Sequence, residues 1–209
     1  MALITGVRRR GERAKVYVEG EFWAEIDAGV ASEHGLYKGA ELSEEELAEA
    51  LRLGDRALAM SRALNFLGYR ARAAGEIRER LRRYGYAGET VDEVVGRLSE
   101  LGYVDDLEFA RTAAREKALK YGPRRVSIDL RMKGIDEDTV REVVEEEFRG
   151  RSELEDARSA AVRRYNTVKG SEAESRRAYG FLMRRGYSTV VCAEIAREYG
   201  GSRTGEAGE

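Results

Sequence analysis

The sequence is poor in cysteine, proline and histidine, each of which occurs once in 209 residues. A single cysteine excludes an intrachain disulfide, which fits a reducing cytoplasm. A single proline, together with abundant alanine, glutamate, arginine and leucine, indicates a mostly helical protein. No apolar run is long enough to span a bilayer, and residues 1–15 lack the apolar core of a signal peptide. We therefore expect a soluble, cytoplasmic protein.

The sequence also lacks a large net charge of either sign. Charged residues make up 36% of the chain, yet the formal net charge is only −2. By composition, this excludes a polybasic nucleic-acid-binding protein and an acidic disordered tail. An apolar content of 42% over 209 residues favours a folded chain with a sizeable core.

Apolar and polar residues alternate over residues 15–26, on both sides of Glu19-Gly20. This alternation predicts two short strands joined by a tight glycine turn. The apolar residues expected on one face are Val16, Val18, Phe22, Ala24 and Ile26. Because an isolated hairpin is only marginally stable in water, we expect it to pack on a third strand or on a helix.

From Ser43 onward the pattern becomes helical. Ser43 and Glu46 have the spacing of a capping box, and apolar residues then recur at helical spacing up to Leu67. Helices separated by short glycine stops are predicted from there to about Tyr199.

The helical part contains an internal repeat. Residues 76–95 align with residues 125–144 at a constant offset of 49 without a gap, and residues 176–187 align again at an offset of 52. The glycines at the matching positions are Gly85, Gly134 and Gly186. Since glycine readily adopts the left-handed backbone that ends a helix, each of them is predicted to end the second helix of a repeated unit.

Each unit is predicted to contain three helices. The first helices are expected at about 45–67, 105–120 and 152–168, the second at 73–84, 123–133 and 171–185, and the third at 89–101, 137–148 and 188–199. Such short helices cannot bury their apolar faces alone, so neighbouring units are expected to pack in series.

The predicted fold class is therefore mainly α, with three tandem three-helix repeats in an elongated, curved array and a small N-terminal β-hairpin extension. The predicted domains are the hairpin extension (1–42), the three repeats (43–104, 105–150 and 151–199) and a disordered tail (200–209).

No catalytic or metal-binding constellation stands out in the sequence. His34 lies in a glycine-rich connector with no second ligand type nearby, and Cys192 lies on an apolar helical face with no partner histidine. Asp105-Asp106 and residues 136–138 are acidic, but each group directly precedes a helical pattern and is interpreted as a helix start. The sequence has no CxxC, P-loop or GxSxG motif. We therefore expect a protein that is not an enzyme and holds no cofactor or metal.

Arginines on the predicted second helices are the best candidates for binding. In the middle unit, Arg125, Asp129 and Lys133 form an alternating-sign ladder typical of a solvated face. Arg124 and Arg131 lie on another stripe without an acidic neighbour. A guanidinium suits carboxylate and phosphate alike, although arginine is also a good helix former at a solvated surface.

The other two units carry similar arginines. In the first unit Glu76 and Glu79 are expected to pair with Arg80 and Arg83, which leaves Arg78 and Arg82 without a partner. In the third unit Arg176-Arg177 occupy the repeat positions of Arg124-Arg125, and Arg184 follows. The candidate partner- or nucleic-acid-binding residues are Arg78, Arg82, Arg124, Arg125, Arg131, Lys133, Arg176, Arg177 and Arg184.

Residues 102–135 contain three motifs that together resemble a known family. The first combines Gly102-Tyr103, Asp105-Asp106 and Phe109-Ala110. The second is Gly122-Pro123-Arg124-Arg125, and the third combines Leu130 with Lys133-Gly134-Ile135. In this order and spacing they resemble the RecX family of regulatory proteins, which modulate the RecA recombinase. The first unit agrees over residues 76–85 and the third over residues 181–187. The resemblance spans roughly residues 15–199 and is strongest over 70–147, with a mild departure at residues 71–75.

The resemblance implies three tandem three-helix repeats that lie in the groove of a RecA filament on single-stranded DNA. It implies a regulator of DNA repair, recombination and the SOS response that inhibits the ATPase, strand-exchange and coprotease activities of RecA. The implied partners are the RecA filament and the single-stranded DNA within it, and the expected state is a monomer with no membrane partner.

Two other functions fit the residues. Three-helix units resemble helix-turn-helix modules, so the chain could bind single- or double-stranded DNA on its own. The near-neutral net charge argues against strong autonomous DNA affinity, whereas the clustered second-helix arginines favour it. The third possibility is a helical-repeat scaffold for another protein.

Overall fold

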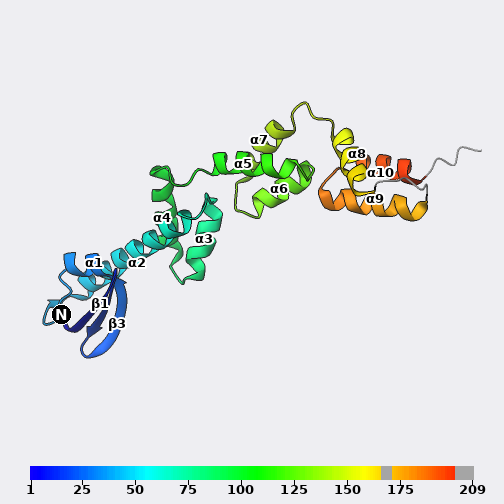
Figure 1. Cartoon of the computed structure of the whole chain (residues 1–209). Helices are drawn as coiled ribbons and strands as arrows, with labels where there is room; N and C mark the ends of the chain where they lie inside the picture. Colours follow the sequence, from blue (N-terminus) through cyan, green and yellow to red (C-terminus); the bar gives the residue numbers. More distant parts are fainter. Residues whose placement is uncertain (166–170, 201–209) are drawn as a thin grey trace, which may run out of the picture. The chain divides into compact units, whose positions relative to one another are not determined.

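The structure is a computed structural model that describes residues 1–165 and 171–200. Over this part the chain forms a small N-terminal sheet followed by a series of short helices, which confirms the predicted mainly α class (Figure 1). The chain divides into two compact units, and the boundary falls between Asp105 and Asp106. The finer division into an extension and three separate repeat domains stays a prediction.

The first unit opens with a four-stranded antiparallel sheet in the order β3-β2-β1-β4. The strands are β1 (Ala2–Arg10), β2 (Arg13–Val18), β3 (Glu21–Asp27) and β4 (Glu41–Leu42). The predicted hairpin is β2–β3, and Glu19 and Gly20 form its turn with φ of 49° and 89°. The expected third strand is β1. The prediction of a bare hairpin omits β1, because three consecutive arginines interrupt its alternation. It also omits β4, which is two residues long, and the short helix α1 (Ala28–Glu33).

One residue of the predicted apolar face lies on the opposite face. A β-bulge places Ala24 opposite Val16 but Phe22 opposite Tyr17, with Trp23 as the extra residue. Phe22 is therefore 57% exposed, and its ring meets that of Tyr17 edge to face with the centroids 5.9 Å apart. The prediction that Phe22 joins the core is wrong, because a one-residue shift sends a side chain to the other face of a sheet.

Helix α2 (Glu44–Leu67) belongs both to the sheet and to the first repeat. The N–H of Ser43 donates to the Glu46 carboxylate at 2.7 Å, and the N–H of Glu46 donates to the Ser43 hydroxyl at 3.2 Å, which confirms the capping box. Near its start Leu47 packs into the core beneath the sheet, and near its end Ala63 packs into the core of the first repeat. One helix thus contributes to both cores, although the predicted boundary at residue 42 lies just before it.

The remaining helices follow the predicted repeat. Repeat 1 continues with α3 (Ala74–Arg83) and α4 (Gly88–Glu100); repeat 2 consists of α5 (Asp106–Ala118), α6 (Pro123–Arg131) and α7 (Glu137–Phe148); and repeat 3 consists of α8 (Glu153–Arg164), α9 (Glu172–Arg185) and α10 (Thr189–Gly200). The predicted tail lies outside the described residues except for Gly200, which ends α10, and the end of the predicted helix 152–168 also lies outside them.

The second helix of each repeat ends in the same loop. Gly85, Gly134 and Gly186 have φ of 91°, 82° and 83°, as predicted for C′ glycines. The N–H of the next residue donates back to the carbonyl five residues earlier, at 3.4, 3.3 and 3.3 Å respectively. This is the Schellman arrangement, which satisfies the last carbonyls of a helix. The internal repeat in the sequence therefore corresponds to a repeated backbone structure.

Candidate partner-binding surface

Helix α6 begins against the end of α9, within the second compact unit. The N–H of Gly122 donates to the carbonyl of Arg185 at 2.8 Å, and the N–H of Arg124 donates to the carbonyl of Gly186 at 3.2 Å. Pro123 is the first helical residue, where its missing N–H costs least, as predicted. The first turn of α6 is therefore capped by backbone carbonyls of another repeat, and its N–H groups are not available to a phosphate.

This contact requires glycine on both sides. A Cβ on Gly186 would lie 2.3 Å from the backbone nitrogen of Arg125, and a Cβ on Gly122 would lie 2.7 Å from the carbonyl oxygen of Gly186. Both distances are shorter than real Cβ contacts allow. The two glycines bring the arginines at the start of α6 next to the last turn of α9.

Arg125 is held by an internal ion pair. Its Nε lies 3.0 Å from the carboxylate of Asp129, as the ladder predicts, and Lys117 of α5 binds the other oxygen of the same carboxylate. Asp129 is buried, with 8% of its surface exposed. A buried carboxylate needs such partners, so Arg125 and Lys117 are primarily structural.

Arg124 and Arg184 line a shallow groove between α6 and α9. The residues that line this groove, called the α6–α9 groove below, are Arg124, Arg125, Ile128, Met183, Arg184, Gly186 and Tyr187. In the part of the chain that the structure describes, neither the Arg124 nor the Arg184 guanidinium has an ion pair or a hydrogen bond. Ile128 and Met183 remain 46% and 36% exposed. The groove thus combines two uncompensated cations with accessible apolar surface.

Arg131 does not remain uncompensated, contrary to the prediction. Its Nε and Nη2 donate to the two carboxylate oxygens of Glu137 at 2.6 and 2.5 Å. This pairing lowers the pKa of Glu137 and raises that of Arg131. Glu137 is six residues away and comes close only because the loop at Gly134 turns the chain back, so helical spacing alone does not reveal the pair. Lys133 lies over the ring of Phe109, 5.3 Å from its centroid.

In repeat 1 one of the two predicted free arginines is paired. Arg78 donates to Asp92 of α4 at 3.1 Å, so the prediction that Arg78 has no acidic partner is wrong, again because the partner comes from another helix. Arg82 is exposed and makes no ion pair with any described residue. Arg83 pairs with Glu79 as expected, whereas Glu76 contacts Arg70 and Arg72.

In repeat 3 the arginines at the start of α9 differ from each other. Arg176 lies 3.4 Å from Glu172, one turn earlier on the same helix, with both side chains largely exposed. Arg177 is exposed and has no ion pair within residues 1–165 and 171–200. Among the described residues, Arg80 and Arg185 also lack an acidic partner, but Arg80 lies over the rings of Phe66 and Tyr84 and Arg185 over those of Tyr121 and Phe181. The second-helix arginines that have neither an acidic partner nor a ring contact in this part of the chain are Arg82, Arg124, Arg177 and Arg184.

The titratable residues weighed as catalytic candidates have structural surroundings. Cys192 is fully buried in the core of repeat 3, and burial raises the pKa of its thiol to about 11. His34 caps the end of α1. Asp106 begins α5, and the Asp136 carboxylate accepts from the Thr139 N–H at 2.9 Å, which confirms both acidic groups as helix starts. Within the described residues no cluster of histidine, cysteine and carboxylates could hold a metal, and no helix could span a membrane.

Two family models match the repeats. Residues 59–98 match the first three-helix domain of RecX, and residues 105–144 match the second. Among curated proteins, the chain is 27% identical to the regulatory protein RecX of Listeria monocytogenes serotype 4b (strain F2365), over 91% of this chain and 72% of that protein. It is 31% identical to that of Bacillus subtilis (strain 168), over 68% of this chain and 54% of that protein.

Solved structures of RecX proteins share the fold of this chain. A crystal structure of regulatory protein RecX superposes with a TM-score of 0.63 at 26% identity, covering 93% of this chain and 98% of that one. The structure of RecX from Lactobacillus salivarius, at 21% identity and a TM-score of 0.56, covers 69% of this chain and shares the fold. With matching domain models in both of its units and a solved relative along nearly its whole length, the chain belongs to the RecX family of regulatory proteins.

Proposed function

We propose that this chain binds a RecA filament on single-stranded DNA and inhibits its ATPase, strand-exchange and coprotease activities. The observation that supports this most directly is the α6–α9 groove, where Arg124 and Arg184 lie without acidic partners beside Ile128 and Met183. Uncompensated arginines next to apolar surface are typical of protein interfaces, in which arginine and aromatic or sulfur-containing residues are enriched. Membership of the RecX family supports the regulatory role, and the α6–α9 groove is the surface that we propose contacts the filament.

The partner-binding residues we assign are Arg124 and Arg184, with Arg82 and Arg177 as further contacts. Arg78, Arg125 and Arg131 are engaged by acidic partners, and Lys133 lies over the ring of Phe109. Arg176 forms only an exposed pair with Glu172, which contributes little to stability. The protein acts without turnover of its own and without a cofactor, as a cytoplasmic monomer.

The test is the DNA-dependent ATPase of RecA, titrated with this protein and with an Arg124→Glu/Arg184→Glu variant. We expect the parent to lower the ATPase rate at concentrations near that of RecA, and the variant to need at least about tenfold more protein, since breaking a charged interface contact costs about 1–3 kcal/mol. The matched control is Arg176→Glu/Arg83→Glu, which makes the same charge change at two arginines whose ion pairs are largely exposed. Equal loss in both variants would assign the effect to net charge, and an unchanged ATPase with the parent would refute the proposal.

Autonomous DNA binding through the repeats remains the second candidate. Exposed, unpaired Arg82 and Arg177 favour it, but the start of α6, where a helix would present N–H groups to a phosphate, is already occupied by carbonyls of α9. A salt titration of DNA binding by the parent and by Arg82→Ala/Arg177→Ala, without RecA, tests this function separately: a slope that does not change would exclude these two arginines as phosphate contacts.

A further inference from the structure

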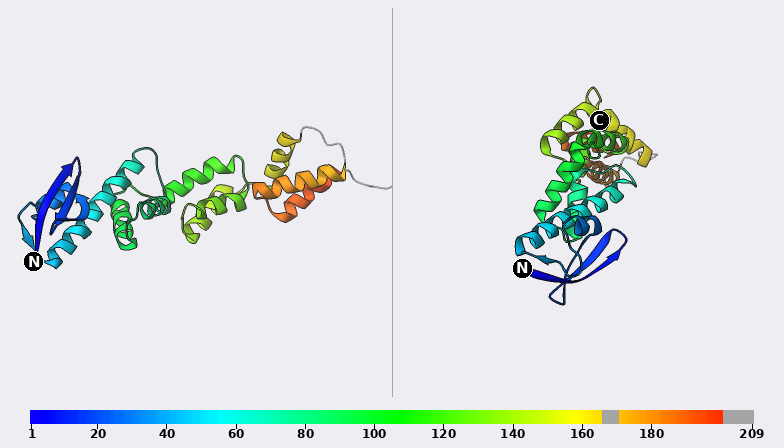
Figure 2. Two further views of the ribbon diagram at one scale, coloured as in Figure 1. Left: turned by 90° about the horizontal axis from the view of Figure 1, so that it is seen from below. Right: turned by 90° about the vertical axis from the view of Figure 1, so that its left-hand side faces the viewer.

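The N-terminal sheet has an outer face that turns away from the core. Ala14 and Val16 of β2 are buried, so Arg13, Lys15 and Tyr17 lie on the opposite face. The helices α1 and α2 pack against the sheet on the side of the buried residues, and Figure 2 shows the strands with these helices on one side of them. Within the first unit the outer face is therefore uncovered.

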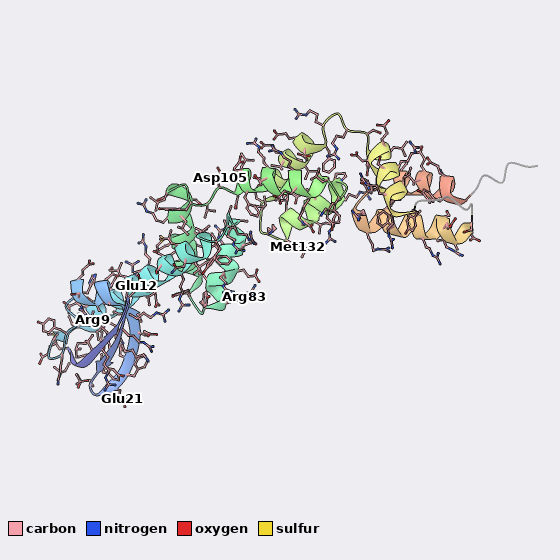
Figure 3. All side chains as sticks on the ribbon, in the orientation of Figure 1. Arg9, Glu12, Glu21, Arg83, Asp105 and Met132 are labelled. Atoms are coloured by element: carbon pink, nitrogen blue, oxygen red, sulfur yellow. The ribbon has the colours of Figure 1, made fainter. Side chains whose placement is uncertain are left out.

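Cations line the half of this face near the β1–β2 turn. The register sets Arg8 opposite Lys15 and Arg10 opposite Arg13, and directly opposed residues share a face. In the described structure Arg8, Arg10 and Lys15 form no ion pair. Figure 3 labels Arg9 and Glu12 at this part of the molecule and Glu21 at the other turn of the sheet. Four cationic side chains thus lie on neighbouring strands.

The acidic residues of the neighbouring strand compensate this charge only in part. Glu25 lies 3.5 Å from Arg13, with both side chains more than a third exposed. Asp27 is engaged elsewhere, because its carboxylate accepts from the N–H groups of Gly29 and Val30 at 2.9 and 3.0 Å. The face therefore keeps an excess of positive charge, in a protein whose overall charge is −2.

Two aromatic rings continue the face beyond the cations. Tyr17 lies opposite Gly6, with its ring 3.7 Å from where a Gly6 Cβ would stand, so the ring lies against the neighbouring strand. The guanidinium of Arg8 is 5.3 Å from the centre of this ring, and Phe22 stands beside it, 57% exposed. The bulge in β3 is what brings Phe22 to this side. An exposed phenylalanine next to uncompensated arginines has no role in the core.

We propose that this cationic sheet face, defined by Arg8, Arg10, Arg13, Lys15, Tyr17 and Phe22, binds single-stranded DNA. Proteins that hold a single strand combine cations that follow the phosphates with aromatic rings on which unpaired bases stack, and both lie here on one face of the sheet. The bases of a duplex are already stacked and paired, so the rings favour a single strand. The choice of DNA over RNA rests on the proposed function, whereas the site itself is argued from the sheet alone.

The experiment measures fluorescence anisotropy of a labelled oligothymidylate with the full-length chain, without RecA, between about 50 and 200 mM salt. Arg8→Ala/Arg10→Ala is expected to lower the slope of log affinity against log salt by about 1.4, since each phosphate contact of a single strand contributes about 0.7. Phe22→Ala is expected to weaken binding at least about fivefold and to leave the slope unchanged, because stacking releases no counterions.

Matched controls come from the same unit. Arg83→Ala/Arg97→Ala removes two exposed cations from the helices, and Tyr69→Ala removes an aromatic side chain that is 85% exposed. The proposal is overturned if the sheet variants bind like these controls, if the parent does not bind the oligonucleotide at the lowest salt, or if it prefers a duplex or an oligouridylate of the same length. Sheet variants that bind DNA normally but lose their effect on RecA would identify the face as a protein-docking surface instead. Because RecA is absent from the binding assay, a failure of the proposed RecA function would leave its result intact.

Discussion

The second helices of repeats 1 and 2 occupy equivalent positions in the repeat, yet their first turns are capped differently. At the start of α3 the N–H of Ala73 donates to the carboxylate of Glu76 at 3.2 Å, a contact within one turn. At the start of α6 the N–H groups of Gly122 and Arg124 donate to carbonyls at the end of α9. One cap is local and the other joins two repeats, so an aligned position in the sequence does not imply the same contact.

The arginines around these helices differ in the same way. In repeat 1 the guanidiniums of Arg72 and Arg62 lie over the rings of Phe66 and Tyr84, at 4.0 and 4.3 Å from the centroids. Such cation–π contacts hold an arginine inside the packing of its own repeat. Within the described residues Arg124 of α6 makes no cation–π contact, and it lines the α6–α9 groove. Beside the long-range cap, Arg185 also lies over two rings, those of Tyr121 and Phe181, so Arg124 is the arginine there that remains available to a partner.

The largest effect is expected from Gly186→Ala, which breaks the long-range cap. A methyl group there would meet the Arg125 backbone at 2.3 Å in a left-handed conformation, so we expect a loss of about 3 kcal/mol in the free energy of unfolding, from backbone strain and overpacking together. Urea unfolding followed by circular dichroism measures it. The matched control is Gly85→Ala, which has a similar φ but nothing within 4 Å, and it should cost only about 1–2 kcal/mol. If the two variants lost equal free energy of unfolding, the close contact between α6 and α9 would contribute nothing to the cost of Gly186→Ala.

A smaller effect is expected from Glu76→Ala, which breaks the local cap of α3. The variant loses the bond to the Ala73 N–H and the ion pairs with Arg70 and Arg72, and we expect unfolding to become easier by about 1–2 kcal/mol. Glu79→Ala removes an exposed pair with Arg83 and should cost less than about 0.5 kcal/mol. If the two variants were equally stable, the cap at α3 would be no stronger than a surface ion pair.

Pro123→Ala should have a still smaller effect and leaves both hydrogen bonds of the long-range cap in place. Proline at the first helical position restricts the unfolded chain, so its replacement should destabilise the protein by about 0.4–1 kcal/mol. The chemical shifts of the Gly122 and Arg124 amides should stay close to those of the parent. Large shifts at these amides would mean that the proline ring, and not the glycines, positions the cap.

The smallest effect concerns pH and compares the third helices. Asp136 caps α7, and the hydrogen bonds it accepts at Thr139 lower the pKa of its carboxyl, whereas the N-cap residue of α4 is Ala87, which has no side-chain cap. A lowered pKa means that the stabilisation is complete above the pKa of the unfolded chain, near 3.9, and is lost as the pH falls through the folded value. We expect Asp136→Asn, which can still cap, to lose less stability than the parent between about pH 5 and pH 3. Identical acid titrations of the two proteins would contradict a titrating cap.

Local signals in the sequence predict local structure well. Ser43 with Glu46, the three C′ glycines and Pro123 each act within one turn of a helix, and all of them are found where expected. Strand β1 was not predicted, because the three arginines at residues 8–10 interrupt its alternation of apolar and polar residues. These three residues nevertheless pair with β2.

The candidate site was predictable only in part, because ion pairs depend on contacts between helices. Helical spacing identified Arg124 as a candidate and paired Arg125 with Asp129, and the internal repeat added Arg184. It could not show that Glu137 reaches Arg131, that Asp92 reaches Arg78 or that Ile128 and Met183 share a groove. Each of these contacts depends on the position of the following helix relative to the preceding one. The spacing of residues within a single helix does not determine that position.

The hydrogen bonds from Gly122 and Arg124 to the end of α9 also affect local unfolding of repeats 2 and 3. The amide hydrogens of the two residues are held by carbonyls more than sixty residues away, so they can exchange with deuterium only when α9 moves off α6. Their exchange rates should follow those of the core amides of repeat 3, around Leu182, more closely than those of the Ala73 amide at the start of α3. Repeats 2 and 3 would then open as one cooperative unit, and a partner seated in the groove would slow exchange in both at once.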